Sequence, residues 1–174
     1  MSALTGQGIS PRKPQAVTAT VKNDGWWPDI DMALLRESAR LPAGVTDKRL
    51  VQRTRQVVLS VNNELSVWKA EQKAAGYTHV AEIPIMDSQG HQHNAANLYD
   101  EHPLITHYLS AVYAEVEARL NEQYRATDST GRADKNAQML DPRVVEGFRD
   151  KDWDVSAILN FNTAAHPRIT VELI

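Results

Sequence analysis

The stretch TDKRLVQRTRQVVLSVNNELSVWKAEQKAAG, residues 46–76, has the spacing of a long amphipathic helix. Its stripe recurs at steps of three and four residues: Leu50, Thr54, Val57, Val61, Leu65, Trp68 and Ala75. Thr46 is a good N-cap, and Gly76 can adopt the left-handed conformation that ends many helices. We therefore expect one helix from Thr46 to about Ala75, with Trp68 in the core.

Three further segments have helical patterns, so the fold class is mainly α, a small bundle of about four helices of which two are long. A short helix is expected from about Asp29, as its N-cap, to Leu41. A third is expected from about Pro103 to Thr127. A fourth has Asp141 as its cap and Pro142 at its first position, and runs to about Leu159. Residues 133–140 could add a helical turn or two, and residues 77–103 form an irregular loop.

The chain divides into three parts. Residues 1–25 form an extended N-terminal tail, because their few large aliphatic side chains lie too far apart to cluster. Residues 26–159 form the helical domain, and residues 160–174 form a C-terminal arm. Trp26 and Trp27 stand where the tail meets the domain, and each indole can bury on the order of 200 Å². They either tether the tail to its own domain or dock on a neighbouring molecule.

The fourth helix carries an outward indole. Val144, Phe148, Val155 and Ile158 share one face, whereas Trp153 points about 180° away from Val144 at 100° per residue. An exposed Trp is costly unless something covers it. The cover is either the chain's own tail or another subunit, since Trp is enriched at interfaces.

The last residues read as a strand. Ile169, Val171 and Leu173 alternate with Thr170 and Glu172. A single strand in a helical domain lacks a partner within it. We therefore expect it to pair with another chain, or with an extended piece of its own tail.

Composition narrows the class of protein. The 174 residues suit one domain, and the absence of cysteine excludes disulfides and thiolate metal sites. A net charge of −3 argues against non-specific nucleic-acid binding. No apolar run is long enough for a membrane span or resembles a secretory signal. We expect a soluble protein assembled in a reducing compartment.

A basic cluster stands at the start of the second helix, where the helix dipole favours acids. It consists of Lys48, Arg49, Arg53 and Arg55. A solvated face explains it, and so would an acidic partner protein or passing phosphates. A helical nucleic-acid-binding protein that uses these four side chains is the alternative function.

Motifs for chemistry are lacking. His91, His93, His102 and His107 match no closed metal signature, and we expect no metal site. No nucleophile elbow, phosphate loop or dinucleotide fingerprint occurs. The acidic residues Asp141, Glu146, Asp150, Asp152 and Asp154 interleave with basic ones, as on a solvated helix face. We expect no cofactor and no enzymatic activity.

Several short segments together carry a family resemblance that runs from about Trp26 to Ile174. They are the aromatic pair before Pro28-Asp29-Ile30-Asp31, Asn63-Glu64-Leu65, residues 72–77 (QKAAGY), 111–114 (AVYA), 123–128 (QYRATD), 133–137 (ADKNA), Arg149-Asp150 with Trp153, and 167–171 (PRITV). In this order and spacing, the chain resembles the phage head-completion or head-stabilisation proteins, the L proteins of temperate contractile-tailed phages.

The resemblance implies a structural virion protein at the neck, where head and tail join. Such proteins bind beneath the portal after DNA packaging, close the filled head and present a surface to a tail-proximal connector or terminator protein. By analogy with other adaptors we expect a homo-oligomeric ring, dodecameric to match the portal, with packaged DNA in its lumen. The portal contact is expected at Arg168, Ile169, Val171, Leu173 and Ile174. Subunit contacts are expected at Trp26, Trp27 and Trp153.

Overall fold

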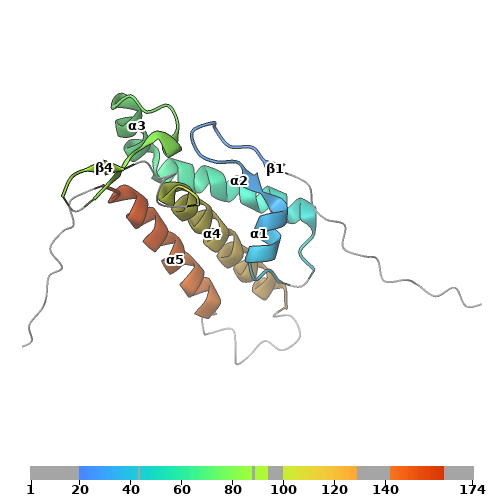
Figure 1. The fold of residues 1–174 in the computed structure, drawn as a ribbon. Helices are drawn as coiled ribbons and strands as arrows, with labels where there is room; N and C mark the ends of the chain where they lie inside the picture. Colours follow the sequence, from blue (N-terminus) through green and yellow to red (C-terminus); the bar gives the residue numbers. More distant parts are fainter. Residues whose placement is uncertain (1–19, 43, 88, 94–99, 129–141, 163–174) are drawn as a thin grey trace, which may run out of the picture.

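The computed structural model describes residues 20–42, 44–87, 89–93, 100–128 and 142–162, and they form a mainly helical domain (Figure 1). The expected fold class is confirmed. The α-helices are α1 (Met32–Ser38), α2 (Asp47–Glu64), α3 (Ser66–Ala74), α4 (Pro103–Asp128) and α5 (Pro142–Leu159). The short elements are β1 (Thr20–Val21), β2 (Ile30–Asp31), the 3₁₀ turn η1 (Val80–Glu82), β3 (Ile85–Met86) and β4 (Gln92–His93).

The centre of the domain is the antiparallel pair α4 and α5, which lie side by side, with α2 crossing α4 (Figure 1). The close approach of α4 and α5 depends on small residues at their contact. A Cβ at Gly147 of α5 would lie 2.9 Å from the Ala118 Cβ and 3.0 Å from the Ala114 carbonyl oxygen of α4. The starts of α4 and α5 at Pro103 and Pro142 agree with the sequence prediction.

The predicted second helix is two helices. Thr46 caps α2 as expected, accepting a hydrogen bond from the Arg49 amide. The helix is interrupted at Leu65, whose backbone (φ −88°, ψ 3°) leaves the helical region before α3 begins. Leu65 and Trp68 are both buried, so the apolar stripe continues across the break. The spacing of the stripe therefore could not reveal the interruption. Gly76, at φ +103°, ends the helical segment as predicted.

The domain begins earlier than expected, and its first helix begins later. β1 pairs with β2, and Val21 is buried in the core, so residues 20–25 belong to the domain rather than to the tail. The N-cap of α1 is Asp31, whose carboxylate accepts from the amides of the second and third residues after it. Asp29 instead binds Lys22 and the Asn23 amide. The expected cap at Asp29 was therefore wrong.

The predicted irregular loop 77–103 contains η1 and a hairpin of β3 and β4 as well as the start of α4. Ile83 and Val80 of this region are buried in the core. Other sequence predictions lie outside the described residues: the cap at Asp141, the helical turns at 133–140 and the strand of the C-terminal arm.

Candidate interaction surfaces

Trp26 and Trp27 lie inside the chain's own core, with 2% and 1% of their surface exposed. The Trp27 ring stacks on Tyr108 of α4 at 4.4 Å between centroids, and on Trp68 of α3 at 6.0 Å. The Lys69 ammonium lies 5.9 Å from the centre of the Trp26 ring. These positions correct the expectation of subunit contacts at Trp26 and Trp27, because neither indole offers a surface to a neighbour. The pair anchors the N-terminal segment to its own domain.

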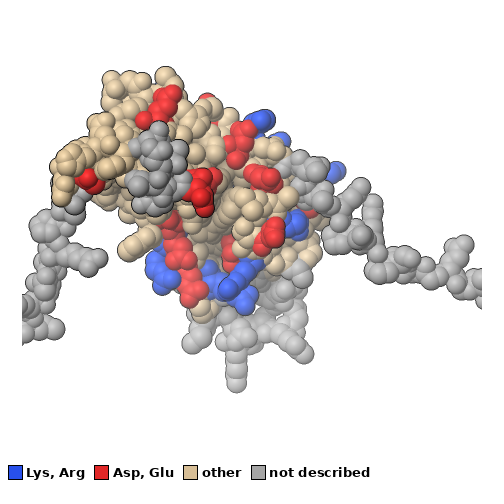
Figure 2. Space-filling view, in the orientation of Figure 1, with Lys and Arg blue, Asp and Glu red and all other residues tan. Residues whose placement is uncertain are grey.

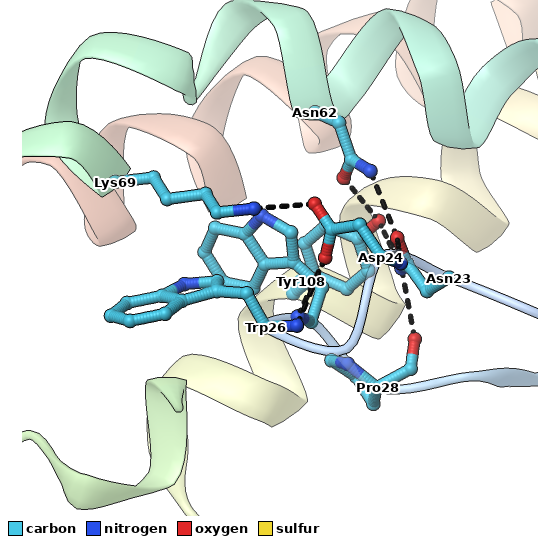
Figure 3. A network of polar contacts seen from close by, with 8 residues as sticks. Asn23, Asp24, Trp26, Pro28, Asn62, Lys69 and Tyr108 are labelled. Carbon is cyan, nitrogen blue, oxygen red and sulfur yellow. Dashed lines mark hydrogen bonds and ion pairs between the residues drawn. The ribbon is translucent and has the colours of Figure 1, made fainter. Parts of the chain in front are cut away.

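A polar network fixes the segment that carries the two indoles (Figure 3). The Asn23 side-chain amide donates to the Tyr108 hydroxyl (2.8 Å) and to the Pro28 carbonyl (2.9 Å). The Tyr108 hydroxyl in turn donates to Asn62 of α2 (2.7 Å), whose amide donates back to Asn23 (2.8 Å). Burial raises the pKa of Tyr108, so its hydroxyl remains a donor at neutral pH. Three parts of the chain are thereby locked together.

Asp24 completes this network beside the indoles (Figure 3). Its carboxylate accepts from the amides of Trp26 (3.0 Å) and Trp27 (3.2 Å) and pairs with Lys69 of α3. Burial opposes ionisation of Asp24, but the Lys69 ammonium and the two amides outweigh it and hold its pKa below the usual range. Asp24 therefore stays charged and fixes the turn into the aromatic pair.

The indole of Trp153 lies on the outer face of α5, as its spacing predicted, and is 76% exposed. It borders an open groove of about 510 Å³ that runs along this face. The groove is lined by Arg149, Asp152, Trp153, Ser156, Ala157 and Asn160. Among the exposed large apolar side chains of the described residues, Trp153 has the greatest exposed fraction. An uncovered Trp beside a groove is typical of a docking surface.

Charges of both signs interleave on the face around α5, in the lower part of Figure 2. Arg149 pairs with Asp150, and Lys151 pairs with Asp152 and with Glu64 of α2. This agrees with the predicted solvated face, with one correction. Asp154 is only 8% exposed and accepts from the His107 ring of α4 at 2.8 Å, so it is a buried link between the two helices.

The basic cluster of α2 is divided in its contacts. Arg49 donates to the Tyr124 hydroxyl (3.1 Å) and lies over its ring, and Arg53 donates to Gln123 (2.7 Å), so both hold the end of α4. Lys48 and Arg55 are exposed, and no partner is found for them in the described parts of the chain. Only these two cations of the four are open to an anionic partner.

The histidines take separate structural roles. His91 and His93 both contact the Asp87 carboxylate across the β3–β4 hairpin, at 3.1 and 3.0 Å. His102 is buried; its Nδ1 accepts from the Leu104 amide, so its Nε2 donates to the Ile83 carbonyl (2.8 Å). Across the residues that the structure describes, no three His, Asp or Glu side chains are arranged to hold a metal ion.

The predicted portal-binding residues, Arg168, Ile169, Val171, Leu173 and Ile174, lie outside the described residues. The point from which their segment leaves the domain is fixed. Asn162, at φ +59°, accepts from the Met86 amide (2.9 Å) and donates to the Pro84 carbonyl (2.6 Å). Phe161 beside it packs against the core and lies 6.0 Å from the His102 ring.

Comparison with known proteins identifies the family of this chain. A profile of the phage head completion protein (GPL) family matches residues 21–174. The chain belongs to this family. The head completion/stabilization protein of Escherichia phage P2 is 32% identical over 156 residues, which cover 89% of this chain and 86% of that protein. No solved structure matches.

The matched region of this head completion protein begins at Val21, the second residue of β1. Membership makes it a structural virion protein rather than an enzyme, as the sequence predicted. No helix in the described portion is long and apolar enough to cross a membrane.

Sequence reasoning identified Trp153 in its outward position but missed the residues that fix the two ends of the described domain. Asn23, Asn62 and Tyr108 meet from three distant parts of the chain, and Asn162 reaches back to Pro84. These polar side chains follow no helical or strand period. A pattern search along the sequence had no signal by which to find them.

Proposed function

We propose that this head completion protein is a connector subunit that binds the portal after DNA packaging, stabilises the filled head and provides the attachment surface for the tail. Its subunits form a ring, dodecameric to match the portal, and meet a tail-proximal connector or terminator protein below. The observation that carries the proposal is the exposed Trp153 with its groove, on a helix whose opposite face is packed against α4.

One further observation supports a subunit that is completed by its neighbours. The exit of the C-terminal arm is held by Asn162, so an adhesive segment starts from a fixed place on the domain. The arm supplies the proposed portal contact through Arg168, Ile169, Val171, Leu173 and Ile174. Trp153 supplies the proposed subunit contact, because an indole at an interface gains a large buried area.

The exposed Lys48 and Arg55 favour a secondary role, contact with packaged DNA in the lumen of the ring. Nucleic-acid binding as the main function is less well supported, because Arg49 and Arg53 are engaged with α4. If duplex binding were the main function, affinity for DNA would fall steeply from low to moderate salt, and the variant with both Lys48→Ala and Arg55→Ala would reduce that slope.

The experiment that tests the proposal mixes the purified protein with its portal and images the product by electron microscopy. We expect a closed ring seated on one end of the portal, with one subunit for each portal subunit. A matched mixture with the Trp153→Glu variant should give portals with isolated subunits and few rings. Bare portals in the wild-type mixture would contradict the proposal.

A further inference from the structure

Two helices of the described domain carry a large, exposed apolar side chain at the middle of their outer faces. On α5 this side chain is Trp153, 76% exposed, and on α2 it is Leu59, 71% exposed. Figure 1 shows α4 between α2 and α5, and both helices pack against it. The two outer faces therefore point away from α4 and cannot meet within one molecule.

The face of α2 around Leu59, which we call the Leu59 face, is basic. Arg55 lies about one turn before Leu59 and Lys48 about three turns before it, and both are exposed without a partner in the described parts of the chain. Gln52 and Gln56, exposed on the same face, are uncharged. An apolar centre beside two open cations favours an acidic protein surface over DNA, because phosphates would leave Leu59 uncovered.

The face of α5 around Trp153, which we call the Trp153 face, carries acidic side chains. Asp150 lies about one turn before Trp153 and Glu146 about two turns before it, and both are exposed. Asp150 pairs with Arg149 at 3.3 Å, but both side chains are mostly exposed, and such surface pairs contribute little to stability. Asp150 can therefore exchange this neighbour for a cation of another molecule.

The two faces are complementary when they pack in parallel, with Leu59 over Trp153. At about 100° per residue, seen from the N-terminus, Asp150 lies about 60° clockwise of Trp153. By the same rule, Arg55 lies about 40° anticlockwise of Leu59. Parallel helices bring the clockwise side of one against the anticlockwise side of the other, so Asp150 and Arg55 face each other, about 4.5 and 6 Å before the apolar pair. Arg149 falls on the other side of the indole, away from Arg55.

The groove beyond Trp153 leaves room for the last turn of α2. Ser156 and Ala157, which line it, have small side chains. In the same register, Asn63 of α2 comes level with Ser156 on the facing side, since the two lie about 6 and 4.5 Å beyond the apolar pair. The shape of this face therefore suits a second helix in the register that the charges favour.

A second copy of the chain can bring the two faces together. α2 and α5 both run toward the side of the molecule that carries α3 and β4 (Figure 1). A neighbouring copy turned by a small angle therefore presents its α2 roughly parallel to α5. A contact between two different faces repeats from copy to copy, and it forms a ring when the rotation closes.

We propose that the Trp153 face of each subunit docks on the Leu59 face of the next, so that α5 meets α2 around the ring. Trp153 covers Leu59, and Asp150 pairs with Arg55. This contact rests on the proposed function, in which Trp153 lies between subunits, and it identifies the surface that receives the indole. It takes Arg55 and Lys48 from the secondary role in DNA contact.

The absence of cysteine allows the contact to be trapped as a disulfide. Asn63→Cys and Ser156→Cys, as two separate full-length variants, are mixed in equal amounts with the portal and oxidised, and linked dimers are measured on a non-reducing gel. We expect linked dimers in the mixture and none with either variant alone, because the contact joins two different faces. Lys73→Cys, exposed on α3, replaces Asn63→Cys in the control mixture and should give none.

Electron microscopy of the same samples separates this contact from the ring itself. Rings on the portal without a link between positions 63 and 156 would overturn the contact and leave the proposed function intact. Links formed by Ser156→Cys alone would show that two α5 faces meet, which would also overturn it. Linked dimers beside bare portals would keep the contact and contradict the ring, whereas bare portals without links would contradict both.

Charge reversal tests the pairing of Asp150 with Arg55. Added to both cysteine variants, Arg55→Asp alone and Asp150→Arg alone should each reduce the yield of linked dimers several-fold. A chain with both changes should restore the yield, because the two reversed charges then face each other. Lys73→Asp removes a cation away from the contact and should leave the yield unchanged, and circular dichroism checks that each variant is folded. Full yield in both single variants would overturn the pairing and leave both cations open to DNA.

Discussion

At the scale of single residues, the four tryptophans of the chain occupy two kinds of site, buried and exposed. Trp26, Trp27 and Trp68 lie within the core, whereas Trp153 faces outward on α5. The buried pair is held by ring stacking and by packing, because neither indole N–H of Trp26 and Trp27 has a hydrogen-bond partner in the described structure. Burial, rather than residue type, therefore decides which indole stabilises the fold.

Replacement of a buried and of an exposed tryptophan should change the free energy of unfolding by different amounts. Trp27→Ala removes the stacks on Tyr108 and Trp68 and should reduce the free energy of unfolding by about 3–5 kcal/mol. Trp153→Ala is the matched control and should change it by no more than about 0.5 kcal/mol. Denaturant unfolding followed by circular dichroism measures both. Equal losses would contradict the assignment of the anchor.

The Tyr108 hydroxyl offers a second residue-scale test. Tyr108→Phe leaves Asn23 and Asn62 without their shared partner, and the free energy of unfolding should fall by about 1–3 kcal/mol. Tyr113→Phe is the control, because the buried Tyr113 hydroxyl has no partner in the described structure. That variant should be neutral or slightly more stable in the same denaturant titration.

At the scale of elements, the pair α4–α5 depends on a close approach that only a small residue permits. Gly147→Ala gains up to roughly 1 kcal/mol of helix propensity. The new Cβ would however meet a backbone oxygen at 3.0 Å and a side chain at 2.9 Å, and overpacking costs about 1–3 kcal/mol. We expect a net loss in thermal unfolding. Ser156→Ala, on the exposed face of the same helix, should show none; a more stable Gly147→Ala protein would contradict this packing.

The stability of the β3–β4 hairpin should depend on pH through the ionisation of Asp87. Hydrogen bonds from His93 and from the His91 amide hold the Asp87 pKa well below its usual range. The contribution of Asp87 to stability is therefore complete above the ordinary carboxyl pKa of about 3.9 and is lost as the pH falls toward the lower folded value. The protection factors of the hairpin amides, which correct for the intrinsic pH dependence of exchange, should fall on acidification. The Asp87→Asn variant should lack this dependence, and identical profiles would exclude the mechanism.

The helices show which parts of the fold could be predicted from the sequence. Periodic apolar residues predicted α4, α5 and the burial of Trp68, because helices bury a stripe with a fixed repeat. The break at Leu65 could not be predicted, because the apolar residues of α2 and α3 keep the same repeat across it. The cap of α1 was placed at Asp29 rather than Asp31 because both are good caps, and a tertiary bond to Lys22 decides between them.

The same limit applies to the candidate site. The outward position of Trp153 follows from helical geometry alone. The burial of Trp26 and Trp27 depends on the network of Asn23, Asn62 and Tyr108, whose members are far apart in the chain. Contacts between residues so distant leave no pattern in one sequence.

At the scale of the whole molecule, the Trp26–Trp27 pair is buried in the described core, whereas the outer face of α5 exposes Trp153. We expect deletion of residues 168–174 to leave the domain folded, because the core and its networks are complete without them. The truncated protein should no longer co-purify with the portal. Unchanged circular dichroism and thermal unfolding are the control, and normal recovery with the portal would contradict the assignment of the arm.

β1, with which the described domain begins, and the C-terminal end of α5 lie on opposite sides of the molecule (Figure 1). A purification tag or fluorescent protein fused to the N-terminus would therefore join the described domain through β1, on the side away from the C-terminal end of α5. Fusions at the C-terminus would burden the very residues proposed to act. This geometry recommends N-terminal fusions for tracking the protein in infected cells, with the arm left in its native form.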